Sequence, residues 1–187
     1  MTGLFRYLES LHPLEEALQQ HLQKTVRKME LGRKEHLLWA GHICRNVYFI
    51  ERGLLRCYER RDATEVCSWF MKEGDVCISV ESFLQQRHSR ENIQAMEDTE
   101  LYYLDFGELQ SIYRQFPVFN LTGRLLVEKY YLLSEQRLGA MRLRRSHERY
   151  GWLAEHFPDL LQRVPAKYLA SYLGITEVML SNIKARR

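Results

Sequence analysis

No stretch of this 187-residue sequence approaches the ~20 consecutive apolar residues that span a bilayer. Its first residues also lack the basic region, apolar run and small-residue cleavage site of a secretory signal. Low-complexity tracts are absent as well. We therefore expect a cytoplasmic protein with no membrane partner, folded as one ordinary domain or as two small domains that share an interface.

The sequence also lacks the paired motifs of metal, redox and hydrolytic sites. Four cysteines lie ten to thirteen residues apart, without any Cys-x-x-Cys pair, at Cys44, Cys57, Cys67 and Cys77. Because metal sites usually bring ligands in close pairs, we expect no metal, no cofactor and four buried cysteines in strands. The seven histidines are equally dispersed, and haem ligation by one of them stays open without support from any motif. No Ser/His/Asp set or phosphate-binding glycine loop has recognisable spacing, so we expect no enzymatic activity.

What the sequence does contain is a series of short strand-like segments between two helical regions. The segments with β character are 35–39, 46–50, 53–58, 64–70, 92–96 and 100–104. Many short strands at regular spacing predict an antiparallel barrel or sandwich with jelly-roll winding. Apolar spacing predicts helix over residues 4–29, before the strands, and over residues 106–113, after them.

A long helix is predicted from about residue 118 to residue 143, because no proline interrupts this stretch. One stripe along it has the alternating four-three spacing of a coiled-coil seam: Val127, Tyr131, Ser134, Leu138 and Met141. A second stripe, with Leu121, Leu125 and Leu132, faces another surface. We expect one side of the helix to pack on the barrel and the other on a second subunit, giving a homodimer. A helix buried on all sides in a monomer is the alternative.

Residues 170–176 separate two short segments with helical apolar spacing, 165–169 and 177–184. Ala170 lets two helices approach closely, and Gly174 permits a sharp turn between them. Thr176 can cap the second helix, while Leu180 and Ile183 face the core. This pattern predicts a DNA-binding helix-turn-helix, whose second helix enters the major groove. An ordinary helical hairpin is the alternative.

The charge distribution supports the DNA-binding interpretation. From Arg137 to the C-terminus there are ten Lys/Arg against four Asp/Glu, whereas the first 136 residues carry 17 against 20. A basic C-terminal third that contains the helix-turn-helix pattern suits a polyanionic partner, although charge alone would also fit a solvated surface.

The order of barrel, long helix and helix-turn-helix resembles the CRP/FNR superfamily of bacterial transcription regulators over nearly the whole chain. Within the barrel, Glu51-Arg52-Gly53-Leu54-Leu55-Arg56 resembles the family's strand–glycine–strand signature, and Glu73-Gly74-Asp75 resembles its Gly-Asp turn. The segment 80–84 looks most like the branch common in Bacteroidetes. The resemblance implies an α+β fold in three parts, with no wing after the helix-turn-helix. These are a barrel or jelly-roll sensor domain (1–116), a dimerisation helix (117–143) and a DNA-binding domain (144–187).

The resemblance also identifies a candidate effector site. In cyclic-nucleotide binders of this family, a glutamate after the Gly-Asp turn holds the ribose and an Arg-Ser pair holds the phosphate. Counting forward from Gly74-Asp75 puts Ser79 at the glutamate position and Ser89-Arg90 at the Arg-Ser positions. A serine cannot replace the carboxylate, and the reversed pair points Arg90 to the opposite face of the strand. We therefore expect a pocket that does not bind cAMP in the usual way and takes either another small effector or nothing. A one-residue loop shift would restore Arg90 to the pocket, and a plain surface arginine is the other alternative.

Aligned on Gly174, the family's groove-facing positions fall on Glu177, Val178 and Asn182. Asn182 could pair bidentately with adenine, Glu177 could accept a hydrogen bond from a cytosine amine, and Val178 could touch a thymine methyl. Phosphate contacts are expected from Thr176, Ser181, Lys184 and the tail Arg186-Arg187.

Together these features predict a homodimeric, sequence-specific transcription regulator that binds double-stranded DNA. The alternative is a small-molecule-binding barrel protein whose helical C-terminus mediates protein–protein interaction. Neutral Asn182 and acidic Glu177 on the reading helix favour the alternative, and salt-dependent DNA binding would distinguish the two.

Overall fold

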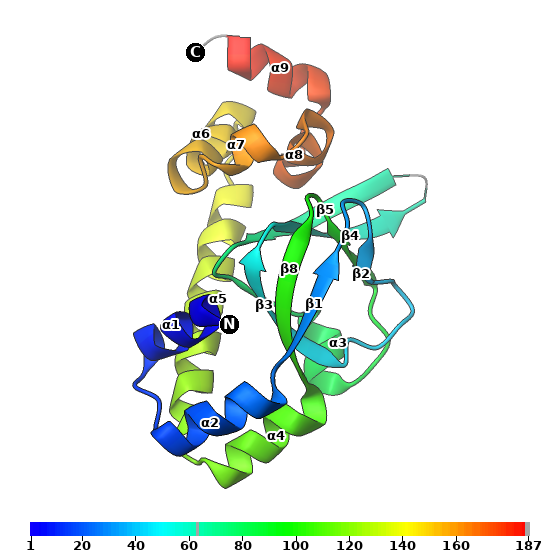
Figure 1. Ribbon diagram of the computed structural model, residues 1–187. Helices are drawn as coiled ribbons and strands as arrows, with labels where there is room; N and C mark the ends of the chain where they lie inside the picture. Colours follow the sequence, from blue (N-terminus) through cyan, green and yellow to red (C-terminus); the bar gives the residue numbers. More distant parts are fainter. Residues whose placement is uncertain (63, 186–187) are drawn as a thin grey trace.

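The computed structural model describes residues 1–62 and 64–185, and places two β-sheets beside a long helix with a helical unit at one end (Figure 1). The chain begins with α1 (Thr2–Leu11) and α2 (Glu16–Thr25). The single helix predicted over residues 4–29 is therefore wrong in two respects. His12 is extended before Pro13 and ends the first helix, as expected of a residue that precedes proline. Residues 27–31 form a strand.

Two four-stranded antiparallel sheets form the barrel that the strand spacing predicted. One sheet has the order β1-β8-β3-β6, and the other has the order β2-β7-β4-β5. The strands of the first sheet are β1 (Arg27–Leu31), β3 (Asn46–Arg52), β6 (Val76–Cys77) and β8 (Thr99–Asp105). The strands of the second are β2 (His36–Leu38), β4 (Leu54–Arg61), β5 (Thr64–Lys72) and β7 (Glu91–Ala95).

The middle of β3 in the first sheet is covered on both faces, so its residues there are apolar on both sides of the strand. Along β3, Tyr48 and Ile50 point into the barrel, whereas Phe49 points outward and packs with Leu4, Leu22 and other residues of α1 and α2. This division follows from the two-residue period of side chains in a strand. The helices at the N-terminus therefore form the outer cover of the barrel.

All four cysteines are buried and carry free thiols. Three lie in strands as predicted, but Cys44 lies in the connection before β3. There its amide donates to the Ser82 hydroxyl, at 2.9 Å, and the side chain packs into the barrel interior. Burial raises the pKa of the Cys44 thiol above its ordinary value.

The remaining elements are helical. A short helix crosses the barrel opening, α3 (Val80–Gln85), and α4 (Phe106–Gln115) follows the last strand with Asp105 and Glu108 forming a capping box. After it come α5 (Phe119–Met141), α6 (Ser146–His156), α7 (Leu160–Arg163), α8 (Ala166–Leu173) and α9 (Glu177–Ala185). Within the described residues, none of these helices has the length and apolar character required to cross a membrane.

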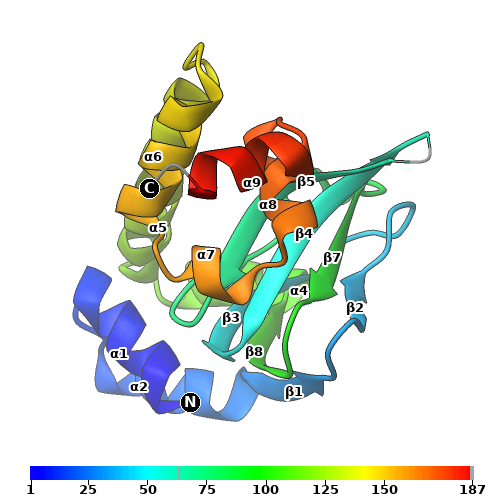
Figure 2. The ribbon, with the colours of Figure 1, turned by 90° about the horizontal axis from the view of Figure 1, so that it is seen from above.

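The helical unit α6–α9 lies on one end of the barrel and shares a core with it. Of these helices, α8 lies against β5, and α9 lies beyond α8 on the side away from the barrel (Figure 1 and Figure 2). One buried cluster combines barrel residues such as Leu54, Cys67 and Phe70 with Leu153 of α6 and Leu173 of α8. The two parts are thus packed together rather than connected only by the long helix.

Candidate DNA-binding surface and effector pocket

The turn between α8 and α9 has the geometry that the sequence predicted. Gly174 adopts the left-handed conformation, at φ +63°, which glycine adopts without steric penalty. The Thr176 hydroxyl accepts a hydrogen bond from the Met179 amide, at 3.2 Å, and so caps α9. Leu180 is fully buried, and Ile183 packs against the same core of α6 and α8. The predicted helix-turn-helix geometry is therefore present.

The outward face of α9 is free of other elements. At 3.6 residues per turn, Val178, Ser181, Asn182 and Ala185 lie opposite the buried pair Leu180 and Ile183, and we name these four residues the reading face. All four are exposed, and Val178 is 70% exposed. Glu177 and Lys184 are also exposed but lie at the margin of this face. Ala185 was not among the residues predicted from the sequence, because alanine carries no polar signal. Arg186 and Arg187 lie outside the described residues.

The long helix α5 is covered on one side only, which contradicts the alternative of a helix buried on all sides. Its inner side contacts the barrel through Tyr130, whose hydroxyl accepts from the Val76 amide at 2.6 Å. The outer side carries the exposed residues Val127, Tyr131, Ser134 and Leu138, which we name the seam. Met141 shares their spacing but packs partly against the core of the helical unit instead. Leu132 is also exposed, on a different side of the helix.

The predicted effector residues are only partly brought together. Ser79 and Ser89 are buried side by side, with their hydroxyl oxygens 3.0 Å apart. Arg90 is exposed on the other face of the chain, as the strand alternation predicted. The hypothesis of a loop shift that returns Arg90 to the pocket is therefore wrong.

A residue that sequence reasoning missed, Glu91, occupies the space beside the two serines. Its carboxylate accepts a hydrogen bond from Ser79, at 2.9 Å, and a longer one from Ser68. Burial raises the pKa of Glu91 above its ordinary value, partly offset by the Ser79 hydrogen bond. The predicted effector site therefore contains an acidic group bonded to Ser79. No pattern in the sequence distinguishes this glutamate from an exposed one.

The barrel interior next to this network is filled with side chains. A buried cluster packs there, with Trp69 and Ile78 against it, and consists mainly of Leu55, Cys57, Cys77, Phe83, Ile93, Ala95 and Leu101. Phe83 of α3 lies edge-on to Phe106 at a centroid separation of 5.3 Å. The segment after the Gly-Asp turn thus packs onto the core.

Comparison with known proteins agrees with this arrangement. Residues 28–116 match the family model of the cyclic nucleotide-binding domain. A variant of CooA from Carboxydothermus hydrogenoformans aligns over 96% of this chain and 83% of its own, at 23% identity and a TM-score of 0.70. The regulator CLP from Xanthomonas campestris aligns over 92% and 91% of the two chains, at 12% identity and a TM-score of 0.71. A protein described as a regulator of the Crp/Fnr family, from Eubacterium rectale, aligns over 95% and 85%, at 16% identity and a TM-score of 0.70. A search of curated protein sequences gave no significant match.

The chain has the fold of these CRP/FNR regulators, and residues 28–116 of its barrel match the cyclic nucleotide-binding domain. The resemblance inferred from the sequence is thereby confirmed. Within this fold, two arginines stack on aromatic rings where the barrel meets the helical unit. Arg137 of α5 lies over the rings of Trp69 and Tyr172, at 5.1 and 4.8 Å, and Arg56 of β4 lies between Tyr58 and Tyr168, at 4.0 and 3.9 Å.

The contact with Arg56 is the more deeply buried of the two. This CRP/FNR-type barrel exposes only 2% of Arg56, whose guanidinium also binds Glu65 at 2.7 Å and Gln94 at 2.6 and 2.9 Å. The arginine interrupts an otherwise apolar run between Leu55 and Cys57. That interruption is the signal in the sequence that could have identified it.

Proposed function

We propose that the protein is a homodimeric transcription regulator that binds double-stranded DNA through the reading face of α9. The observation that carries this proposal is a correctly capped second helix whose outward face is fully exposed while its inner face is buried. Three parts serve the function: a sensor domain (1–116), a dimerisation helix (117–143) and a DNA-binding domain (144–187).

Six exposed residues of α9 and its cap have distinct roles in this proposal. Asn182 pairs with an adenine edge, Val178 touches a thymine methyl, and Glu177 accepts from a cytosine amine. Phosphate contacts come from Thr176, Ser181 and Lys184. The basic charge of the C-terminal third adds a contribution that does not depend on the base sequence.

Dimerisation through the seam would place two reading helices on one side of the assembly. Such pairs bind half-sites about one helical turn apart, ~34 Å, and favour a palindrome because the protein itself is two-fold symmetric. The apolar character of Val127, Tyr131 and Leu138 supports this use of the seam. Exposed apolar residues in one stripe mark an interaction surface more often than scattered ones do.

The deciding experiment is a selection from random duplex DNA at 50 and 200 mM salt, followed by sequencing of the retained fraction. We expect an enriched palindrome whose affinity falls steeply with salt, by about 10³-fold if some six phosphates are neutralised. Asn182→Ala should relax base preference at one position in each half-site, whereas Lys184→Ala should weaken binding to every sequence equally. No retention at either salt concentration would favour the protein–protein interaction role instead.

The barrel should not respond to cAMP. Glu91 puts a carboxylate next to Ser79, and Arg90 points away, so the cyclic phosphate would meet a negative group rather than a positive one. We expect calorimetry with cAMP at 1 mM to show no binding, and the selected DNA affinity to stay unchanged with cAMP present. A dissociation constant in the micromolar range would contradict this assignment and would mean that Glu91 moves aside. If cAMP does not bind, as we expect, the regulator would respond either to an unidentified small effector or to none.

A further inference from the structure

An arginine of α7, Arg163, attaches the helical unit to turns of the barrel. The Arg163 guanidinium donates to both oxygens of Glu97, at 3.0 and 2.7 Å, and to both oxygens of Glu73, at 2.9 and 2.8 Å. Glu73 lies in the turn between β5 and β6, and Glu97 lies in the turn between β7 and β8. A planar guanidinium suits this double bidentate arrangement, which a lysine could not reproduce.

The two acceptors are themselves fixed to the barrel. One Glu73 oxygen also accepts from the Gly53 amide, at 2.8 Å, in the turn between β3 and β4. Gly53 has a φ of +108°, and a Cβ there would overlap with Thr99, so this turn admits only glycine. Burial alone would raise the pKa of Glu73, but hydrogen bonds from Arg163 and Gly53 lower it below its ordinary value. The carboxylate therefore stays charged at neutral pH, and Arg163 links three barrel turns.

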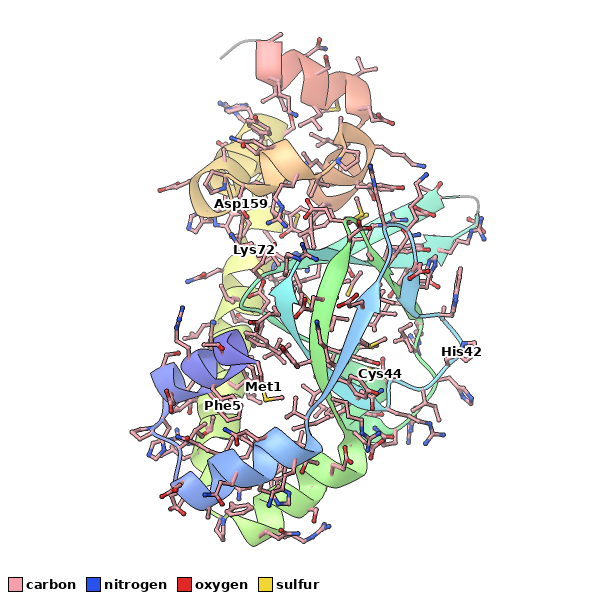
Figure 3. The ribbon with its side chains drawn as sticks, in the orientation of Figure 1. Met1, Phe5, His42, Cys44, Lys72 and Asp159 are labelled. Atoms are coloured by element: carbon pink, nitrogen blue, oxygen red, sulfur yellow. The ribbon has the colours of Figure 1, made fainter. Side chains whose placement is uncertain are left out.

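Further contacts on the same interface hold the unit in one orientation. Lys72 binds Asp159 at 2.7 Å, and Figure 3 shows the two residues meeting where the helical unit reaches the barrel. On α8, the Ser171 hydroxyl donates to the Glu65 carbonyl, at 2.8 Å, and accepts from the Cys67 amide, at 3.0 Å. Because β5 is the outer strand of its sheet, Ser171 satisfies backbone groups that would otherwise lack a partner.

The connections from Arg163 to the reading face are short. Only Val164 and Pro165 separate α7 from α8, and only residues 174–176 separate α8 from α9. Val164 is buried, and Pro165 has a restricted backbone. The position of Arg163 therefore influences the direction of α9 through these two short connections.

We propose that Arg163 is a positioning residue for DNA reading. It holds the helix-turn-helix on the barrel, so that the two reading faces of a dimer present a fixed separation to DNA. This inference rests on the proposed function. Preorganisation of this kind improves binding because less conformational freedom is lost when the complex forms. It also makes binding sensitive to the distance between half-sites.

The test is a series of selected palindromes in which the distance between half-sites varies by single base pairs. We expect the wild type to prefer one spacing strongly. Arg163→Gln should lose about ten-fold in affinity at that spacing and should discriminate poorly among the others. Arg6→Gln, which removes the same charge from an exposed site on α1, should behave as the wild type. Hydrogen exchange at the Cys67 amide, bonded to Ser171, should be faster in Arg163→Gln.

A second variant separates positioning from direct phosphate contact. Glu73→Gln/Glu97→Gln removes the two carboxylate charges that bind Arg163 and raises the net charge, so it would strengthen DNA binding if Arg163 contacted phosphate. If Arg163 positions the unit, this variant should also lose spacing discrimination, even if Arg163→Gln fails to fold. If the folded variants still discriminate fully among the half-site spacings, the positioning role of Arg163 is wrong, whereas the proposed function stands. Absence of DNA binding by the wild type overturns the proposed function and the positioning role with it.

Discussion

Replacing Tyr131 with glutamate should abolish the dimer that we propose to form through the seam. Tyr131 is 63% exposed at the centre of the seam, between Val127 and Leu138. In a two-fold symmetric contact a residue near the axis faces its own copy, so Tyr131→Glu brings two carboxylates together in an apolar interface. The desolvation of two like charges costs at least several kcal/mol, and about 3 kcal/mol already weakens association more than 100-fold. Sedimentation at micromolar concentration would measure this change.

DNA binding should fall together with dimerisation. Two linked reading helices bind a palindrome with a gain of about 10²- to 10⁴-fold over one, because the second contact is intramolecular. Tyr131→Glu should therefore bind the selected palindrome with the affinity of a single half-site. Since the substitution lies on α5, away from the reading face, it leaves base preference within a half-site unchanged.

Leu132→Glu is the matched control for this prediction. Leu132 is the next residue, is 61% exposed and is also apolar, but it lies off the seam on another side of the helix. We expect Leu132→Glu to remain a dimer with full DNA affinity. Loss of the dimer in Leu132→Glu but not in Tyr131→Glu would move the interface to that side of α5.

The parts of the fold that were predictable from the sequence are those set by local chemistry. The turn at Gly174, the cap at Thr176 and the buried Leu180 all depend on residues within one or two helical turns. Strands such as β4 and β5 were recognisable because each is a run rich in apolar residues that is bounded by turn residues. Such signals are contained in a window of a few residues, so the sequence displays them directly.

Elements that depend on distant partners were not predictable in this way. The strand β1 is charged at Arg27, Lys28 and Glu30, and its pairing with β8 joins segments some 70 residues apart. The strand β6 has only two residues, and its pairing with β3 makes it a strand. In both cases the segment becomes a strand because it pairs with a neighbour in the assembled sheet, and this pairing outweighs the weak β propensity of its own residues.

The candidate effector site shows the same limitation. Counting along the chain correctly placed Ser79 and Ser89 together and Arg90 outside. It did not reveal Glu91 as the group bound to Ser79, because two residues that are twelve apart meet only after α3 and β7 have packed. Arg163 was missed for the same reason, since its carboxylate partners are 66 and 90 residues away.

The other large effect is expected at Arg56, where the barrel meets α8. Arg56→Met should lower the melting temperature by about 6–12 °C. The substitution leaves the Glu65 carboxylate and the Gln94 amide oxygen without their shared donor, at 2.7 and 2.6 Å in the wild type. Removing one partner of a buried ion pair lowers the free energy of unfolding by about 3–5 kcal/mol. Because Glu65 is partly exposed, we expect a loss near the lower end of this range. For a chain of this size each kcal/mol shifts the midpoint by about 2–4 °C.

Arg60→Met is the control, because Arg60 lies on the same strand but is exposed, and its loss should move the midpoint by less than about 2 °C. Adding Glu65→Gln to Arg56→Met should recover part of the loss, since the unpaired charge is removed.

A double-mutant cycle with Tyr168→Leu should give a coupling of about 1–2 kcal/mol, the size of a desolvated cation–π contact. Equal losses for Arg56→Met and Arg60→Met, with no coupling to Tyr168, would mean that Arg56 does not contribute to holding α8 on the barrel. A measured coupling would instead make α8 part of the folding unit of the barrel, so that a change inside the barrel reaches the proposed DNA-binding surface through the contact between Arg56 and Tyr168.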